Sequence, residues 1–489
     1  MSCGSRSAAR AGLSIGGWVQ DRSGAIHRRK TRPSGEDRVG GICVVLTQAE
    51  NEMLTGVGAG TPMGRMLREH WLPAIFSDEV RADGDPLRIR LLGEDLLAFR
   101  DSQGRVGIVE TRCPHRGAGL FHGRNEECGL RCVYHGWKFD VEGRCVDMPS
   151  EPPESSFKDK IQLLSYPVLE RNGIVWAYMV RRASPPQLPA LEWNLVPPSQ
   201  VHASKRVQDC NWVQALEGGI DPSHVSFLHA PLQPSSGPGA IGERLYLGDK
   251  HPRFEMLETP YGMRIGSRRN VEEGRLYWSI THFMMPWYNA FNALAFTRGD
   301  PHPTVGGFAW VPMDDTTTMA WCFTWNHYRP LAENEIAERF YQEKLGGGVH
   351  VEGPNLLPAT TEPGGAWRPV ANSSNDYLID RQAQRMVRFS GSPGMSAQDA
   401  AVQDSMGPIA DRSREHLGSS DAPLIRMRRA VLRAAVELDE NGTAPPGVDV
   451  PESYRVRPAA VILAEDEDWT RAAADWVNAQ PNAVAPVLS

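Results

Sequence analysis

Four candidate metal ligands in one short stretch constrain this chain more than any other feature of its sequence. They form two clips, Cys113-Pro-His115 and Cys132-Val-Tyr-His135, which are separated by residues 116–131. A cysteine and a histidine so close together let one thiolate and one imidazole project from the same loop. Two such loops can offer two thiolates and two imidazoles to one centre, so the stretch predicts a metal site.

The mixture of ligands indicates which kind of centre this is. A Rieske 2Fe–2S centre has two cysteines on one iron and two histidines on the other, and the two clips supply this set. Zinc accepts the same ligand types but usually binds clips of two cysteines. Glycines and a tryptophan beside the clips allow tight loops, and Pro149 is placed to close a third. The pattern favours a Rieske cluster over zinc and over four buried residues without metal.

Composition and charge exclude several other classes of protein. The chain has 489 residues, 41% of them hydrophobic and 23% charged, and a formal net charge of −7, all ordinary for a globular protein. The acidic balance argues against binding to nucleic acid. No apolar run approaches the roughly 18 residues of a membrane helix. The 8 cysteines are too sparse for a disulfide scaffold and no secretion signal is evident, so we expect a cytoplasmic protein.

The N-terminal part divides into two segments. Residues 1–44 contain eight Lys or Arg against three acids and show no periodicity, which predicts a disordered extension. Such a leader is either an organellar transit peptide or a stretch upstream of the true start of the protein. Capping signals at Thr47 and Thr61 predict a helical segment at 45–72.

The rest of the chain predicts an α+β protein with two domains. Short β-rich runs separated by turns predict a small all-β domain at 73–183, which contains the two clips. Strands mixed with helices predict a larger α+β domain at 200–440, with an antiparallel sheet flanked by helices. We expect residues 184–199 to form a Pro-rich linker and residues 441–489 to form a C-terminal tail.

A second group of candidate ligands lies in Asp221-Pro-Ser-His224-Val-Ser-Phe-Leu-His229. Among 14 histidines a pair with this spacing arises easily by chance. The pair indicates a metal site only because Asp221 lies beside it and the two clips lie upstream. On a helix Asp221 and His224 share a face. His229 meets the same metal only if the helix bends, which the neighbouring Gly-Gly pair and proline allow.

Two histidines and one carboxylate on one face of a non-haem Fe(II) leave positions open for dioxygen. The best downstream carboxylate is Asp399, which we expect at the opening of a long helix; Asp404 is the second choice. Each of these acids is otherwise an ordinary capping or solvated side chain. For both acids this ordinary role is favoured by the residues alone, so the carboxylate ligand beside His224 and His229 stays open.

With both motifs in this order, the chain resembles the Rieske non-haem iron aromatic-ring hydroxylating oxygenases, above all the phthalate 4,5-dioxygenase group. The resemblance spans about residues 46–433. Respiratory Rieske proteins carry an additional cysteine in each loop where this chain has Ala118 and Tyr134, so it resembles the oxygenase type. Further similar stretches are 60–64, 131–140, 148–153, 214–221, 375–381 and 405–409.

The resemblance implies a role for each candidate site residue. Cys113, His115, Cys132 and His135 hold the 2Fe–2S cluster. His224, His229 and Asp399 hold the catalytic iron in the domain at 200–440. Asp221 is the acid that bridges the cluster of one subunit to the iron of the next.

The resemblance also implies activity and partners. We expect an oxygenase component, a homotrimer or stacked trimers, that uses O2 to hydroxylate an aromatic substrate carrying a carboxylate. The resemblance implies that an NADH-dependent flavin and iron–sulfur reductase supplies the electrons, and the sequence, which shows no nucleotide-binding fingerprint, is consistent with this. The alternatives are a monooxygenase or O-demethylase, a Rieske electron carrier, and a non-catalytic scaffold. The arginines considered for a substrate carboxylate are Arg244, Arg253, Arg264, Arg268 and Arg269.

Overall fold

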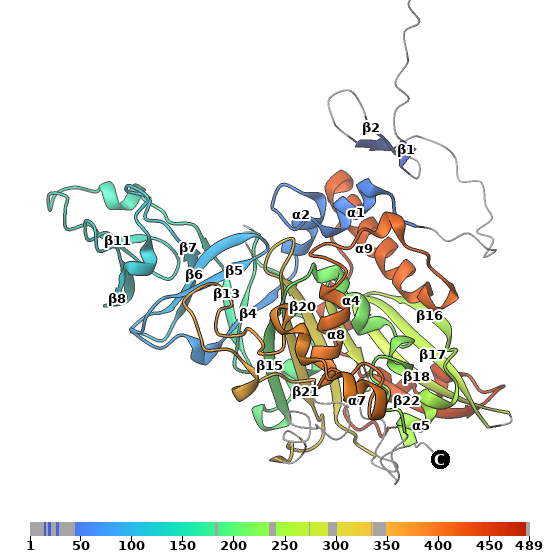
Figure 1. The fold of residues 1–489 in the computed structure, drawn as a ribbon. Helices are drawn as coiled ribbons and strands as arrows, with labels where there is room; N and C mark the ends of the chain where they lie inside the picture. The colour runs from blue at the N-terminus through green and yellow to red at the C-terminus, as the bar shows by residue number, and fades with distance from the viewer. Residues whose placement is uncertain are drawn as a thin grey trace, which may run out of the picture.

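The computed structural model describes residues 45–485 apart from 181–183, 234–240, 273, 292–300, 334 and 336–348, and three short strands before them. A small β domain projects from a larger body in which helices cover a long sheet (Figure 1). This arrangement confirms the predicted fold class.

The first 44 residues are described only as three short strands. These strands pair with one another as an antiparallel sheet, whereas the sequence predicted disorder. The remainder of this predicted extension lies outside the described residues. The strands are β1 (Ser14–Ile15), β2 (Trp18–Gln20) and β3 (Ile26–Arg28).

The predicted helical segment is present as α1 (Gln48–Thr55) and α2 (Pro62–Arg68). Thr47 and Glu50 form the expected capping box, and Thr61 caps α2 directly before Pro62. Both helices pack on α9 (Ala422–Asn441), to which Arg65 forms an ion pair through Asp439. This segment therefore belongs structurally to the larger body.

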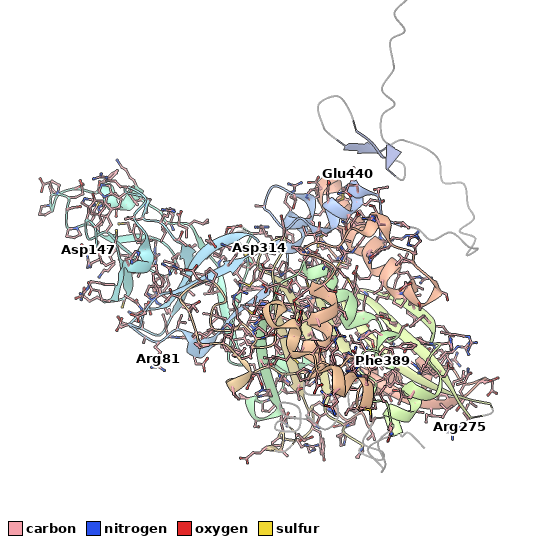
Figure 2. All side chains as sticks on the ribbon, viewed as in Figure 1. Arg81, Asp147, Arg275, Asp314, Phe389 and Glu440 are labelled. Carbon is pink, nitrogen blue, oxygen red and sulfur yellow. The ribbon has the colours of Figure 1, made fainter. Side chains whose placement is uncertain are left out.

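The small domain is built from three antiparallel sheets with strand orders β12-β7-β6-β5, β13-β14-β4 and β11-β10-β9-β8. Its outermost sheet, β8 to β11, has a separate small core and carries Asp147 at the far end of the domain (Figure 2). The strands are β4 (Leu72–Phe76), β5 (Leu87–Leu91), β6 (Glu94–Arg100), β7 (Val106–Glu110), β8 (Arg124–Glu126), β9 (Gly129–Arg131), β10 (Lys138–Phe139), β11 (Cys145–Asp147), β12 (Ser165–Tyr166), β13 (Val168–Arg171) and β14 (Ile174–Ala177).

The larger domain contains one sheet in the order β15-β21-β20-β19-β18-β17-β16, with β22 paired to β18, and every pairing is antiparallel. This confirms the antiparallel sheet that the sequence predicted, and eight strands of the described residues form it. They are β15 (Val201–Gln208), β16 (Arg253–Thr259), β17 (Gly262–Glu272), β18 (Arg275–Met284), β19 (Tyr288–Phe291), β20 (Val305–Pro312), β21 (Thr318–Trp325) and β22 (Ala459–Ala464).

Helix α4 (Trp212–Ile220) lies across this sheet and approaches it closely at its C-terminal end. A Cβ atom on Gly219 would come within 2.7 Å of Asn289 Oδ1 and 2.9 Å of Trp310 Nε1, so only glycine fits there. The end of α4 is thereby fixed against β19 and β20. The other helices of the domain are α3 (Glu192–Leu195), α5 (Ile241–Gly248), α7 (Arg381–Met386), α8 (Met395–Asp404), α10 (Trp469–Ala472) and α11 (Ala474–Val477).

None of the helices in the described part of the chain is both long and apolar enough to cross a bilayer.

The segments predicted as linker and tail differ from the expectation, because both are built into the larger domain. The segment 184–199 contains α3, whose Glu192 and Trp193 are buried, and the segment 441–489 contributes β22 to the sheet. Helix α3 is too short to show a periodic pattern, and β22 is far in sequence from its partner strand β18. An ion pair between buried Arg457 and Glu192 joins the two segments, with 2.7 Å between Nε and Oε2.

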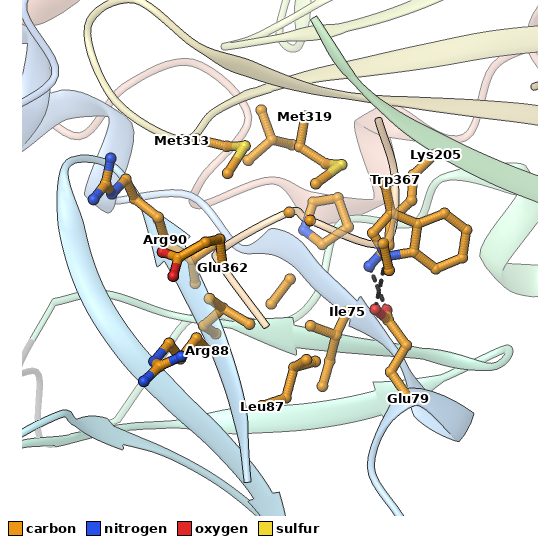
Figure 3. A pocket seen from close by; sticks show the side chains of 18 of the residues that line it. Ile75, Glu79, Leu87, Arg88, Arg90, Lys205, Met313, Met319, Glu362 and Trp367 are labelled. Carbon is orange, nitrogen blue, oxygen red and sulfur yellow. Dashed lines mark hydrogen bonds and ion pairs between the residues drawn. The ribbon is translucent and has the colours of Figure 1, made fainter. Parts of the chain in front are cut away.

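The two domains meet at a pocket lined by residues of both (Figure 3). Glu79 of the small domain pairs with Lys205 of β15 and accepts a 2.8 Å hydrogen bond from Trp367 Nε1. Burial lowers the pKa of Lys205, although the Glu79 carboxylate acts against this change. The backbone of Gly93 also donates to Met313 O at 2.7 Å, so the junction is polar and ordered.

We expect Arg457→Met to destabilise the larger domain by about 3–5 kcal/mol, because Glu192 would remain buried without a cation. Urea unfolding monitored by tryptophan fluorescence measures this change. Arg455→Met, at an exposed neighbouring position, serves as the control and should shift stability by less than about 0.5 kcal/mol. Equal unfolding midpoints for the two variants would contradict the structural role of the segment 441–489.

Candidate metal centres

The two clips of the small domain fold into loops with the same backbone geometry. The Cys113 N–H donates to Ala118 O at 2.8 Å, and the Cys132 N–H donates to Trp137 O at 2.8 Å. Four residues after each cysteine stands a glycine with positive φ, +75° at Gly117 and +80° at Gly136. Pro149 packs against Gly136 as a third loop, as the sequence indicated.

The loops separate the two kinds of ligand. The cysteine side chains are buried, whereas His115 is exposed and His135 half-buried, and the two imidazole ring centroids are 4.5 Å apart. Burial, together with the adjacent Cys132 thiol, raises the pKa of Cys113 to about 11. Two neighbouring buried thiols ionise readily only beside a cation, which fits an iron pair bound between the loops.

The first part of the second site is a turn rather than the expected bent helix. Helix α4 ends at Ile220, Asp221 is extended, and His224–Ser226 forms a single 3-10 turn. The cause is Pro222, which disfavours helical geometry in the residue before it. Phe227 N and Leu228 N both donate to His224 O, at 2.9 and 2.8 Å, and so bring His229 round to the same side.

The carboxylate lies on α8, but not where it was predicted. Asp399 is the fifth residue of α8 (Met395–Asp404) rather than the first residue of a longer helix. The helix ends before Gly407, which has a φ of +91° and precedes Pro408. The expectation of a long helix that opens at Asp399 was wrong, because this Gly-Pro pair prevents the helix from continuing.

The structure brings all three predicted iron ligands together. His224 Nε2 and His229 Nε2 are 3.1 Å apart, and Asp399 Oδ1 lies 3.6 and 3.3 Å from them. Asp399 Oδ1 is fully buried and has no hydrogen bond within the described residues. Three converging ligand atoms, one of them unsatisfied, fit a divalent cation held on one face.

Electrostatics favours a cation at the same point. Burial opposes ionisation of Asp399, but His229 and His224 outweigh it and lower the pKa of Asp399. Burial likewise opposes ionisation of Asp221, while contacts to His224 and Ser223 lower the pKa of Asp221 overall. Burial opposes protonation of His224, but Asp221 and Asp399 outweigh it and raise the pKa of His224. The carboxylates therefore favour a positive charge beside them, which a metal ion bound by the imidazoles supplies.

Residues that sequence reasoning missed set the orientation of the imidazoles. Gln398 Nε2 donates to Ser392 O at 3.0 Å, so Gln398 Oε1 must accept the 2.7 Å hydrogen bond from His229 Nδ1. His224 Nδ1 faces Asp221 Oδ2 at 3.4 Å. Both rings therefore direct the lone pair of Nε2 toward Asp399. No pattern in the sequence distinguished Gln398 from other polar residues on a helix.

The remaining candidates lie elsewhere. Asp404, the second choice for a ligand, accepts a 2.6 Å hydrogen bond from the Tyr377 hydroxyl and is not part of the ligand group. Arg253 is exposed on β16, and Arg264 donates to Asn478 Oδ1 at the surface. Arg268 lies on β17, the same strand as Arg264. The side chain of Arg244 lies outside the described residues. Arg269 is buried and donates to Pro222 O at 2.6 Å, so it holds the turn before His224.

A second group of two histidines and a carboxylate was not predicted. His202, His350 and Glu352 also have ligand atoms within 4.8 Å of one another. Both ring nitrogens of His350 already have hydroxyl partners, Ser204 Oγ at 2.6 Å and Thr324 Oγ1 at 3.0 Å. This group is satisfied as a hydrogen-bonded cluster, in contrast to the one around Asp399.

Family comparisons agree with both centres. Residues 70–167 match the model of the Rieske [2Fe-2S] domain, and residues 177–486 match the model described as LigXa C-terminal domain like. The chain therefore belongs to the Rieske non-haem iron oxygenases, enzymes that incorporate O2 and carry a 2Fe–2S cluster and a mononuclear iron.

Its relatives include the oxygenase subunit of 3-chlorobenzoate-3,4-dioxygenase from Comamonas testosteroni, which is 41% identical over 86% of this chain and 96% of that protein. The phthalate 4,5-dioxygenase oxygenase subunit from Pseudomonas putida is 36% identical over 87% of this chain and 94% of that protein. Within the family this chain is thus the oxygenase component of a multicomponent system.

Solved structures show the same fold. Dicamba monooxygenase bound to dicamba matches with a TM-score of 0.53 at 17% identity, covering 76% of this chain and 98% of that one.

We expect Gln398→Leu to weaken binding of the mononuclear iron about 10- to 100-fold, because His229 loses the acceptor that fixes its tautomer. Iron content and chelator competition measure the effect, and the cluster absorbance should not change. Gln398→Glu retains an acceptor oxygen at this position and serves as the matched control. Unchanged chelator resistance in Gln398→Leu would show that the amide has no such role.

Proposed function

We propose that this chain hydroxylates an aromatic carboxylic acid, using O2 and electrons that an NADH-dependent flavin and iron–sulfur reductase supplies. The observation that carries the proposal is the convergence of His224, His229 and Asp399 in a chain that also contains both cluster loops. The names of two relatives, 3-chlorobenzoate-3,4-dioxygenase and phthalate 4,5-dioxygenase, specify aromatic carboxylates.

In this proposal His224, His229 and Asp399 hold the mononuclear iron, and Cys113, His115, Cys132 and His135 hold the cluster. When bound, the cluster supplies single electrons and the iron activates O2. The protein's own residues orient these groups and keep water away. The sheet beneath α4 contributes apolar side chains for an aromatic ring, with Phe291 and Phe308 stacked at 5.2 Å.

A dioxygenase outcome, with a cis-dihydrodiol product, is our first choice. A relative from Sphingobium that is 31% identical over 80% of this chain is named 5,5'-dehydrodivanillate O-demethylase oxygenase subunit, which keeps the monooxygenase outcome as the second. Both outcomes use the same metal ligands, so product analysis must distinguish them.

The proposal is tested first by iron content and then by turnover. We expect about three iron atoms per chain, against two for a Rieske electron carrier. Reductase-coupled NADH oxidation should be stimulated by benzoate, 3-chlorobenzoate or phthalate, with a hydroxylated product. Two or fewer irons after anaerobic reconstitution, or coupled turnover only on non-aromatic compounds, would contradict the proposal.

We also infer that the chain acts as a homo-oligomer, a trimer or stacked trimers. The cluster loops lie at the outer end of the small domain, away from α8 and the iron ligands (Figure 1). Exposed apolar side chains flank both places: Val133 and Tyr134 beside the cluster histidine, Phe227 and Val402 near the iron ligands. Such patches are typical of an interface, so a neighbouring subunit can bring its cluster close to this iron.

Asp221 is the residue that we propose to connect the two centres across that interface. Its carboxylate already contacts His224 Nδ1 through one oxygen, while the other accepts a 2.7 Å hydrogen bond from Ser223 N. The side chain remains 22% exposed. An ionised carboxylate can accept a further N–H, here that of a cluster histidine from the neighbouring subunit.

We expect Asp221→Asn to retain its oligomer, cluster spectrum and most of its iron, yet to turn over very slowly. The amide nitrogen cannot accept a hydrogen bond, so one of the two imidazole contacts breaks. Stopped-flow absorbance of a pre-reduced cluster, mixed with substrate and O2, should remain that of the reduced form. Normal reoxidation coupled to product would contradict the bridging role, and loss of iron alone would make Asp221 a ligand.

A further inference from the structure

Arg206 lies on the side of β15 that faces the iron ligands. Side chains alternate across a strand, so Arg206 shares a face with Gln208. Gln208 Nε2 donates to Gln403 Oε1 of α8 at 2.6 Å, and Asp399 stands one helical turn before Gln403. This register places Arg206 opposite the turn of α8 that carries Asp399.

The guanidinium of Arg206 is buried but not neutralised. The residue is only 4% exposed, and the hydrogen bond found for it is from Nη2 to Gln208 Oε1 at 3.2 Å. No ion pair to Arg206 occurs within the described part of the chain, although a guanidinium has five N–H donors. A buried and unpaired charge is costly, so such a group usually has an anionic partner.

Other buried arginines of this chain show what is missing. Arg412 and Arg428 share Glu217, with closest contacts of 3.0 and 2.6 Å, and Arg457 pairs with Glu192. Even Lys205, the neighbour of Arg206 on the opposite face of β15, is paired with Glu79. Two buried arginines depart from this pattern. Arg269 donates to the backbone oxygens of Asp249 and Pro222, whereas Arg206 has no such backbone acceptors among the described residues and faces the iron ligands.

The acid that acts most on Arg206 is itself an iron ligand. Burial lowers the pKa of Arg206, and the largest opposing influence is the charge of Asp399. A metal ion bound to Asp399 neutralises the charge of this carboxylate and leaves a net positive charge beside Arg206. In the iron-loaded protein the surroundings of Arg206 therefore favour an anion.

The neighbourhood of Arg206 is otherwise suited to an aromatic ring. Its guanidinium carbon lies 5.9 Å from the centroid of the Trp310 ring. The centroid of the Phe308 ring, two residues earlier on β20, lies 4.7 Å from that of Trp310. Ala320 is the direct partner of Arg206 on β21. The planes of the Trp310 and Phe308 rings are inclined by 31°, and these two residues and Ala320 are buried, so they form an apolar wall next to a single cation.

We propose that Arg206 binds the carboxylate of the aromatic substrate, with the ring lying along the wall of Trp310, Phe308 and Ala320 toward the iron. This inference rests on the proposed function and names the residue that selects acids over neutral aromatics. A guanidinium matches a carboxylate with two parallel N–H donors, which gives orientation as well as affinity.

The test compares an acid with its neutral isostere. Isothermal titration calorimetry of the anaerobic, iron-loaded holoenzyme gives the Kd for benzoate and for benzamide. For Arg206→Met we expect the Kd for benzoate to rise about 10- to 100-fold and that for benzamide to change less than threefold. The preference for the acid should then largely disappear, and KM for benzoate should rise more than kcat falls.

Two further variants separate recognition from folding. Arg206→Lys keeps the charge without the paired donors and should give an intermediate Kd for benzoate. Arg253→Met, at an exposed arginine of β16, should match the wild type. Cluster absorbance and iron content verify that each variant is folded and loaded.

The outcomes also distinguish this inference from the proposed function. Suppose that the wild type hydroxylates aromatic acids. If both Arg206 variants then lose affinity equally for benzoate and benzamide, or lose none, the inference alone is overturned. A wild-type protein that hydroxylates no aromatic acid would overturn the proposed function and this inference with it.

Discussion

The convergence of ligand atoms from His224, His229 and Asp399 on one point is the constraint on which the iron site depends. Asp221 and Asp399 contact opposite ring nitrogens of His224, and the pKa of each acid is below its ordinary value although burial opposes ionisation. Ligand atoms this close together, one of them a buried carboxylate oxygen without a hydrogen bond in the described residues, are stable only around a cation. The contacts that fix α4 against the sheet, through Gly219, and the turn, through Arg269, keep these charges in place.

The two centres of this oxygenase component are built on opposite principles. The cluster loops bury their thiols and expose their imidazoles, so their outer surface is available to another protein. At the iron, the imidazoles point inward and their second nitrogens are engaged by Gln398 and Asp221. One centre presents imidazoles at the surface, whereas the other holds them in fixed orientation around one point.

Short-range features were predictable from the sequence, and long-range ones were less so. The Cys-His clips and the caps at Thr47 and Thr61 depend on neighbours in sequence, and the structure agrees with them. Asp399 was found through the family resemblance, but its place in α8 was not, because Gly407 ended the helix early.

Residues whose role depends on tertiary contacts gave no sequence signal. The strand β22 joins the sheet only because β18 lies beside it, so the segment 441–489 was taken for a tail. Arg206 resembles any arginine in a strand until its burial and its missing partner are seen in three dimensions.

The alternation of side chains along β15 makes the domain junction and the iron pocket mutually dependent. Lys205 points to the junction and Arg206 to the opposite face, on adjacent residues of one strand. Inserting or deleting a single residue in β15 would exchange the two cations between the faces. Chimeras that combine a small domain and a large domain from different oxygenases should therefore be joined outside β15. The register of this strand, and with it the face to which each cation points, is then unchanged.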